Sequence, residues 1–223
     1  MPKVSEEYFD NKRKIILDAA LKVFSKKPSY TVSMKDIIKE SKLSQGGVYK
    51  YYSNIDDIII SLINRNKIEV NPKDIINENY NNPEKVIFEF LKTYKNYFFE
   101  TIKEYGKIFF ELYPMLINDR KRLKKYVNKI DSSVNFVYWI ETLFGYFDKK
   151  IKEKYFNPIA NSQDVYMQIV SILKGIETEL IIKKYYNKKG EYKIDFEVKL
   201  DDLIETIYRT ILFLMGSKEL KNE

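Results

Sequence analysis

Breaks in regular structure are rare along this chain, which contains 7 glycines and 6 prolines in 223 residues. Glycine and proline are the residues that most often interrupt helices and strands, so their scarcity favours long helices over many short strands. Apolar residues also recur at the three- and four-residue spacing of amphipathic helices. We therefore predict an all-α protein, with a small N-terminal domain and a larger helical bundle.

The N-terminal domain is predicted to span residues 1–54 and to contain three helices. Apolar side chains at helical spacing predict a first helix over residues 10–25. Thr31 and Ser33 are candidate N-caps of a short second helix, and Ser44 is a candidate N-cap of a third over residues 45–52. A fourth helix is expected to begin within residues 53–57.

The larger domain, residues 55–223, is predicted to be helical throughout. We expect a less regular junction at residues 71–82, followed by long amphipathic helices. Their predicted ranges are 84–104, 105–117 with a break at Pro114, 119–155, 162–186 and 200–216. A polar loop is expected over residues 187–199.

The chain has no cysteine and no histidine. Disulfides, zinc sites built on thiolates or imidazoles, and Ser-His catalytic triads are therefore impossible. We expect a protein that is not an enzyme and that holds no cofactor and no metal. No uncharged apolar run approaches the ~20 residues that span a bilayer, and residues 1–14 are too polar for a signal peptide. These features predict a cytoplasmic location and no membrane partner.

Positive charge is concentrated at the N-terminal end. Residues 1–53 hold 11 Lys and Arg against 6 Asp and Glu, a net charge of +5, whereas the remaining residues carry only +2. A module that binds phosphates needs such an excess. Chance clustering of charge on a solvated face is the alternative interpretation.

Residues 33–52 have the spacing of a helix-turn-helix, whose second short helix, the recognition helix, enters the major groove of DNA. Ile37, Ile38 and Leu43 are expected to hold the two helices together, while Val48 and Tyr52 anchor the recognition helix on the first helix. The side chains left to face outward are those of Ser44, Gln45, Gly46, Gly47, Tyr49, Lys50 and Tyr51.

The outward residues suit DNA. Gln45 can read base edges, Lys50 can neutralise a phosphate, and hydroxyl groups can bind phosphate oxygens. Two successive glycines are unfavourable inside a short helix. Close approach of the backbone to a DNA strand would explain Gly46 and Gly47; a frayed loop is the other explanation.

At this point the sequence resembles a known family. Residues 15–63 are similar to the N-terminal domain of TetR-family (tetracycline-repressor-like) regulators. The matching positions are Ala19, Ala20, Phe24, Thr31, Ser33, Ile37, Leu43, Ser44, Gly46, Val48, Tyr49, Tyr52 and Ile58.

The resemblance implies a homodimer that binds double-stranded DNA at a palindromic operator through two N-terminal domains. It also implies a C-terminal domain that binds a small molecule, whose arrival moves the domains and releases the DNA. Carried over by position, the DNA-binding residues are Thr31, Ser33, Lys35, Ser44, Gln45, Gly46, Gly47, Tyr49, Lys50 and Tyr51.

Three positions depart from the family pattern. Lys42 stands where the family usually has glycine in the turn, which predicts a wider turn. Tyr52 replaces a phenylalanine at the end of the recognition helix. Ile55 replaces a lysine that grips phosphate at the start of the fourth helix. The contact is either missing or supplied by the N-terminal arm, through Lys12, Arg13 or Lys14.

Aromatic residues crowd three helices of the larger domain. They form either an ordinary core or an aromatic-lined cavity for a lipophilic or aromatic ligand. Glu111 and Glu141 lie among them, and each either faces a cationic ligand or marks the solvent side of its helix. The candidate ligand-binding residues are Phe98, Phe109, Phe110, Glu111, Tyr113, Phe136 and Trp139.

The last two long helices have broad apolar faces, which suit a four-helix interface between two copies of the chain; packing within one copy is the alternative. The candidate interface residues are Ile169, Ile172, Leu173, Ile176, Leu180, Ile204, Ile207, Ile211 and Leu214. The basic run 120–129 is interpreted as a solvated face. Pro114 is either a kink that couples the domains or a plain helix end.

Together these features predict a sequence-specific DNA-binding transcriptional regulator, a repressor released from its operator by a small effector molecule. The alternative is a DNA-binding regulator without a ligand, or a helical adaptor that acts through a protein partner.

Overall fold

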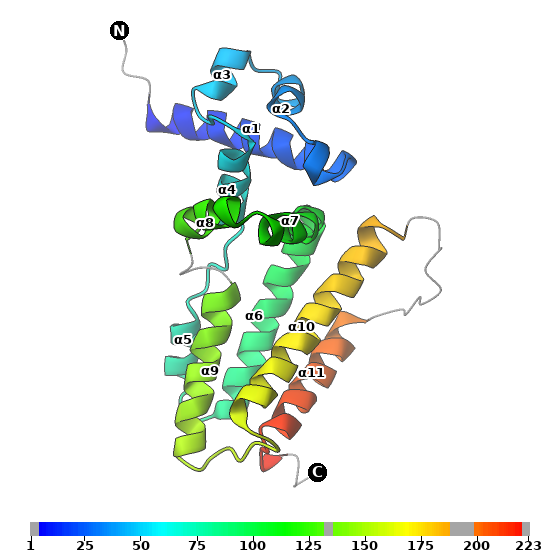
Figure 1. Ribbon diagram of the computed structural model, residues 1–223. Helices are drawn as coiled ribbons and strands as arrows, with labels where there is room; N and C mark the ends of the chain where they lie inside the picture. The colour runs from blue at the N-terminus through cyan, green and yellow to red at the C-terminus, as the bar shows by residue number, and fades with distance from the viewer. Residues whose placement is uncertain (1–4, 132–135, 188–198, 220–223) are drawn as a thin grey trace. The chain divides into compact units, whose positions relative to one another are not determined.

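In the computed structural model, which describes residues 5–131, 136–187 and 199–219, every regular element is a helix (Figure 1). The prediction of an all-α fold is confirmed. None of the helices in these ranges is long and apolar enough to cross a membrane. In chain order they are α1 (Glu6–Lys26), the short 3-10 helix η1 (Ser29–Thr31), α2 (Met34–Ser41), α3 (Gln45–Tyr49), α4 (Ile55–Arg65), α5 (Pro72–Glu78), α6 (Pro83–Glu104), α7 (Gly106–Asn118), α8 (Arg120–Lys129), α9 (Phe136–Lys152), α10 (Ser162–Tyr185) and α11 (Leu200–Leu214).

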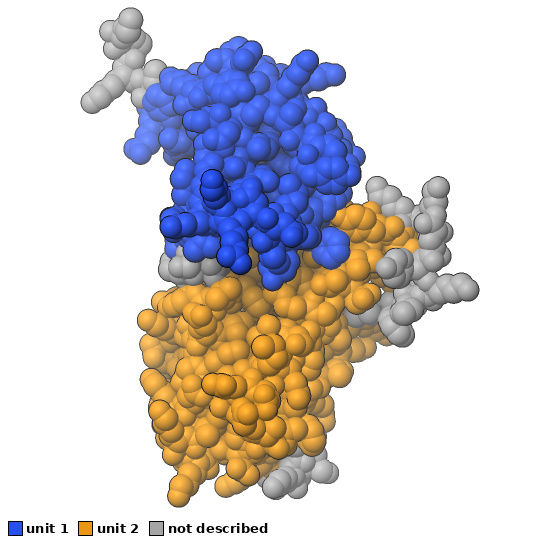
Figure 2. All heavy atoms as spheres, viewed as in Figure 1, with its two compact units in different colours: residues 1–67, 103–131 blue, residues 68–102, 132–223 orange. Residues whose placement is uncertain are grey.

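The helices group into two compact units, which Figure 2 colours separately. Unit 1 comprises residues 1–67 and 103–131, so α7 and α8 pack with the N-terminal helices α1 to α4. Unit 2 comprises residues 68–102 and 132–223, and it holds α5, most of α6, and α9 to α11. Each unit thus combines separate stretches of the chain. The predicted domain boundary at residue 54 stays a prediction.

One hydrophobic cluster fills unit 1. Phe24 of α1 and Val48 of α3 have no exposed surface, and Ile108 of α7 and Tyr126 of α8 are each 1% exposed in the same cluster. Burying one large apolar side chain contributes roughly 1.5–3 kcal/mol to stability. The helix-turn-helix and α7–α8 therefore share a core.

Local capping explains where the short helices begin. Ser33 and Asp36 form a reciprocal capping box at α2, in which Asp36 accepts a hydrogen bond from the Ser33 N–H at 2.9 Å. Ser44 Oγ accepts from the Gly47 N–H at 3.1 Å and so starts α3. Such caps satisfy N–H groups that have no partner within the helix. The predictions for Ser33 and Ser44 as N-caps are confirmed.

The turn between α2 and α3 differs from the prediction. Lys42 adopts the left-handed conformation, with φ 57° and ψ 20°, as the C-cap of α2. A glycine at this position would adopt that conformation without steric cost. The turn therefore keeps a single left-handed residue and is not widened, because Lys42 accepts the strain that glycine would avoid.

Unit 2 is a bundle in which α6, α9, α10 and α11 run along one another, with α5 packed on α9 (Figure 1). The start of α10 is tied to the end of α11, since the Ile159 N–H donates to the Leu214 carbonyl at 3.1 Å. Gly216 follows with φ 62°, where any Cβ would collide with the carbonyl oxygen of Asn157. The core of unit 2 includes Val86, Ile87, Leu143, Phe147, Val165 and Ile169.

Three predicted ranges are corrected. The helix expected over 119–155 is two helices, because α8 ends at Lys129 and the backbone of the next residue, Ile130, is extended. The junction expected to be irregular contains α5, which Asn71 caps and Pro72 begins. Pro114 does not break its helix but lies inside α7. Most of the predicted polar loop, residues 188–198, lies outside the described residues.

Candidate nucleic-acid interface

One side of the recognition helix α3 is anchored in the core, and its other side is exposed. Val48 is fully buried and Tyr52 is 6% exposed, so both are held in the core of unit 1, as predicted. Ile37 lies in the same core, with Ile38 and Leu43 packed against it. Of the ten predicted DNA-binding residues, Gly47 and Tyr51 are half-buried. The other eight are exposed: Thr31, Ser33, Lys35, Ser44, Gln45, Gly46, Tyr49 and Lys50.

The two glycines of α3 differ in what a side chain at their position would contact. A Cβ on Gly47 would lie 3.1 Å from Ser44 Oγ, the atom that caps the helix, so a side chain there presses on the cap. A Cβ on Gly46 would meet no described atom within 4 Å. Packing therefore disfavours a side chain at position 47 but makes no demand at position 46.

The aromatic ring of Phe9 in α1 contacts the residues at the end of α3, and the sequence reasoning missed it. The Lys50 ammonium lies 4.9 Å from the centroid of the Phe9 ring, a cation–π distance. The Phe9 ring also lies 6.2 Å from that of Tyr51. These contacts hold Lys50 beside the recognition helix. The only signal in the sequence was an isolated apolar residue before the first predicted helix.

The N-terminal arm is less free than the sequence suggested. Arg13 pairs with Asp10 at 2.8 Å, and Lys14 pairs with Asp18 at 2.9 Å. Lys12 lies over the Tyr8 ring at 5.4 Å. Meanwhile Ile55, the residue that replaces the family lysine, packs against the core of unit 1.

A partly buried ion pair on α7 holds the end of α1. Lys107 Nζ donates to the carbonyl oxygens of Phe24 at 3.0 Å and Lys27 at 2.7 Å, and it pairs with Glu111 at 3.1 Å. Glu111 in turn accepts from both the N–H and the hydroxyl of Ser29, each at 2.6 Å. A cation at the C-terminal end of a helix is stabilised by the helix dipole. Glu111 therefore has partners within the protein.

A second polar link joins α1, α4 and the first residue before α7. Arg65 donates to Asp18 at 2.7 Å and to the Tyr105 hydroxyl at 2.9 Å. Partial burial by itself raises the pKa of Asp18, but hydrogen bonds from Lys14 and Arg65 outweigh it, and the pKa lies below its usual value. The carboxylate thus stays charged and keeps the link.

The third link corrects the interpretation of the basic run 120–129. Asp56, in the first turn of α4, accepts from Arg122 Nε at 2.8 Å and from the Tyr126 hydroxyl at 2.9 Å. Asp57 pairs with Lys125 at 3.4 Å and Lys129 at 3.3 Å. One side of α8 is therefore bound to α4 and is not a solvated face. Arg120, Lys121 and Lys124 are exposed.

The predicted ligand residues fall into two groups. Phe98, Phe136 and Trp139 belong to unit 2, where Tyr94 packs on Phe98 and Phe136 with ring centroids 5.3 and 5.1 Å away. Phe109, Phe110, Glu111 and Tyr113 are on α7 in unit 1, and Tyr113 is exposed. Glu141 is exposed on α9. The structure thus gathers Phe98 and Phe136 around Tyr94, which the prediction omitted, while Trp139 packs on Phe90.

The predicted dimer residues also divide. Five of them, Ile169, Leu173, Ile207, Ile211 and Leu214, are buried within the single chain, and the other four, Ile172, Ile176, Leu180 and Ile204, are half-buried. Met167 and Phe213, which the prediction left out, are 66% and 60% exposed.

The N-terminal part of this chain is similar in sequence to known transcriptional regulators. Residues 16–62 match the sequence profile of bacterial regulatory proteins of the tetR family. Over 62 residues, 28% of this chain, the sequence is 40% identical to YfiR of Bacillus subtilis, an uncharacterized HTH-type transcriptional regulator. Over 58 residues, 26% of the chain, it is 40% identical to HbdR of Aromatoleum, an HTH-type transcriptional regulator. These matches span only 30% and 24% of the relatives' own lengths.

Solved structures extend the likeness to the whole fold. The structure of HlyIIR, a hemolysin II transcriptional regulator, aligns with a TM-score of 0.61 at 19% identity, over 90% of this chain and 97% of that one. A putative TetR-family regulator from Syntrophomonas wolfei aligns with a TM-score of 0.58 at 18% identity, over 93% and 96%. At these identities the likeness concerns the fold alone.

Proposed function

We propose that this chain is a DNA-binding regulator of transcription of the TetR family, a dimeric repressor which an effector molecule releases from a palindromic operator. One observation carries the DNA-binding part. The recognition helix is anchored by buried Val48 and Tyr52, while Gln45, Gly46 and Lys50 stand exposed on it. In a helix-turn-helix such residues contact base edges and phosphates.

Gly46 supports a close approach of DNA. Glycine costs a helix about 1 kcal/mol relative to alanine, and no described neighbour within 4 Å requires it. A requirement from outside the protein explains its presence. Gly46→Ala is therefore expected to stabilise the free protein slightly while it weakens binding to operator DNA.

The proposed dimer uses the outer side of α10 and α11. Met167 near the start of α10 and Phe213 near the end of α11 are both exposed, and the backbone bond from Ile159 to Leu214 places these two ends together. The half-buried Ile172 and Ile176 continue the apolar face along α10. Phe213→Glu should shift the protein to monomers in sedimentation experiments, while Lys149→Glu on exposed α9 surface should not.

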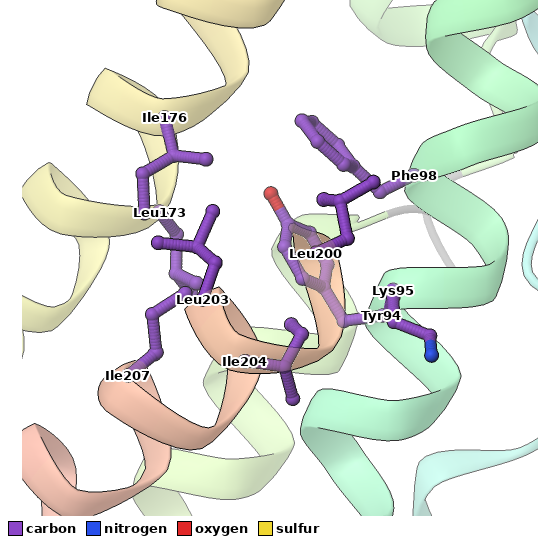
Figure 3. Close-up of a pocket in the computed structure, with 9 residues that line it drawn as sticks. All are labelled: Tyr94, Lys95, Phe98, Leu173, Ile176, Leu200, Leu203, Ile204 and Ile207. Carbon is purple, nitrogen blue, oxygen red and sulfur yellow. The ribbon is translucent and has the colours of Figure 1, made fainter. Parts of the chain in front are cut away.

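The proposed response to an effector requires that the helix-turn-helix move as one piece with α7 and α8. The three polar links and the shared core of unit 1 support this. One observation favours the alternative of a regulator without a small ligand: the cavity lined by Tyr94, Phe98, Leu173 and their neighbours (Figure 3) measures only about 10 Å³.

Fluorescence anisotropy with operator fragments selected from random palindromic DNA tests the DNA-binding part. Affinity should fall by about one log unit per log unit of salt for each phosphate that is neutralised. Lys50→Ala should weaken binding to all sequences and reduce this slope by about one, whereas Gln45→Ala should relax base preference. Lys149→Ala is the matched charge control. If Gln45→Ala and Lys50→Ala both left affinity, salt slope and preference unchanged, the assignment of the interface would be wrong.

A further inference from the structure

Lys50 stands exposed as the C-cap of α3, and an aromatic ring rather than an acid holds its ammonium group. The ammonium lies 4.9 Å from the centroid of the Phe9 ring. Within the described part of the chain it forms no ion pair with a carboxylate. The face of an aromatic ring attracts a cation although the ring has no net charge. Lys50 is therefore held in place without being neutralised.

Other cations of the N-terminal helices are held by carboxylates instead. Arg13 pairs with Asp10 at 2.8 Å, and Lys27 pairs with Asp36 at the same distance. A phosphate that approached either cation would compete with the carboxylate already bound to it. At Lys50 no anion has to be displaced, because the side chain rests on a neutral ring.

The Phe9 ring is itself fixed by its neighbours. The Ser5 side chain caps α1 by accepting from the Tyr8 N–H at 3.3 Å, which places Phe9 close to the start of the helix. The centroid of the Phe9 ring lies 6.2 Å from that of Tyr51, and Tyr51 packs against the core of unit 1. The Tyr8 ring meets the Phe9 ring edge-on at 6.0 Å. The ring that holds Lys50 is thus connected to the core.

A lysine held in this way is prepared for a phosphate. A long charged side chain on a surface samples many rotamers, and ordering it on binding costs free energy. Contact with a fixed ring restricts those rotamers before DNA arrives, so less of the cost remains. A lysine acts on a phosphate as a point charge, and phosphate contacts carry no sequence information. The benefit should therefore be the same for every DNA sequence.

We propose that Phe9 is a positioning residue for DNA binding, whose ring holds the Lys50 ammonium ready for a phosphate of the DNA backbone. This inference rests on the proposed function, and it extends the interface to a residue of α1 outside the helix-turn-helix. Phe9 acts through Lys50 and need not touch DNA. A ring that only packs α1 against α3 would act on binding without Lys50, and the experiment separates the two roles.

Fluorescence anisotropy on the full chain compares the selected operator with DNA of unrelated sequence. Phe9→Leu keeps an apolar side chain but removes the ring, and it should weaken binding to both DNAs about two- to tenfold, the cost of ordering one long side chain. Phe9→Tyr keeps the ring and should bind as the native chain does. In a chain that carries Lys50→Ala, Phe9→Leu should have no further effect, because no ammonium is left to position.

Tyr8→Leu is the matched control, since the Tyr8 ring neighbours Phe9 but lies over Lys12, at 5.4 Å. Its effect on DNA binding should be the same with and without Lys50→Ala. Pentafluorophenylalanine at position 9 keeps the shape of the ring but reverses the charge of its face. It should weaken binding as Phe9→Leu does, and it decides the question even if the leucine variant folds poorly.

The inference is overturned if Phe9→Leu and the fluorinated ring leave DNA binding unchanged, if Phe9→Leu weakens binding equally with and without Lys50→Ala, or if Phe9→Tyr fails to restore it. A native chain that binds no DNA rejects the proposed function. A native chain whose DNA binding depends on Lys50 but not on Phe9 rejects this inference alone.

Discussion

The two units differ in whether their buried or partly buried polar groups have hydrogen-bond partners. In unit 1, Lys107 makes three contacts and Glu111 accepts from both donors of Ser29. In unit 2, the Tyr94 hydroxyl and the Trp139 N–H have no partner among the described residues. Satisfied polar groups rigidify a structure, whereas unsatisfied groups raise the free energy of the conformation that holds them. The difference suggests a unit built to move as one piece and a unit built to adapt.

The largest effect is expected from breaking the Lys107 pair. Lys107→Met leaves Glu111 and two carbonyl oxygens without their cation, and the pair's side chains are only 12% and 15% exposed. Removing one partner of a buried ion pair costs about 3 kcal/mol or more. Urea denaturation measures the loss, with exposed Lys149→Met as control. A loss no larger than that of the control would contradict the rigid role of unit 1.

A smaller loss is expected from Asp56→Asn, which weakens the contacts of Arg122 and Tyr126 with α4. Weakening charged hydrogen bonds at a partly buried site should cost about 1–3 kcal/mol. Asp201→Asn is the matched control, because the Asp201 side chain is 87% exposed and surface pairs contribute little. Equal denaturation midpoints for the two variants would show that α8 does not stabilise α4.

Removal of the hydroxyl group is expected to change stability in opposite directions at two tyrosines. Tyr94→Phe removes a hydroxyl that has no partner among the described residues and should stabilise the protein, by about 1 kcal/mol at most. Tyr146→Phe leaves the Tyr80 carbonyl without its donor and should destabilise it by about 1 kcal/mol. Thermal unfolding of the two variants beside the native chain measures this contrast. A loss of stability in Tyr94→Phe would mean that its hydroxyl is satisfied.

The smallest effect concerns pH. Hydrogen bonds from Lys27 and then Ser33 lower the pKa of Asp36 to about 2. Because this value lies below that of the unfolded chain, about 3.9, the carboxylate stabilises the fold above pH 4, and the contribution is lost as the pH falls toward 2. Solvent screening keeps it small. Stability curves between pH 5 and 2 should be flatter for Asp36→Asn than for the native chain; parallel curves would exclude Asp36 as the titrating group.

Local features could be predicted from the sequence, and distant ones could not. Ser33 and Ser44 predicted the starts of α2 and α3, because an N-cap acts on N–H groups two or three residues away. The interpretation of residues 120–129 as a solvated face was wrong for the side of α8 that contacts α4, because Asp56 lies 66 residues before Arg122, a separation that no periodic pattern records. Tyr94 was passed over because an aromatic residue in a helical stripe looks the same whether its hydroxyl is satisfied or not.

The sequence by itself determined that the chain is all helical and that a helix-turn-helix with exposed Gln45 and Lys50 stands near its N-terminus. Helical spacing and capping act within a few residues, so they are legible without a structure. Only the tertiary structure decided that α7 and α8 pack with the N-terminal helices, because Lys107 and Glu111 reach groups about 80 residues away. It alone also showed that the buried hydroxyl of Tyr94 has no partner within the described part of the chain. Burial and hydrogen bonding depend on which segments contact one another in the folded chain. A sequence shows only which segments have side chains that could make such contacts.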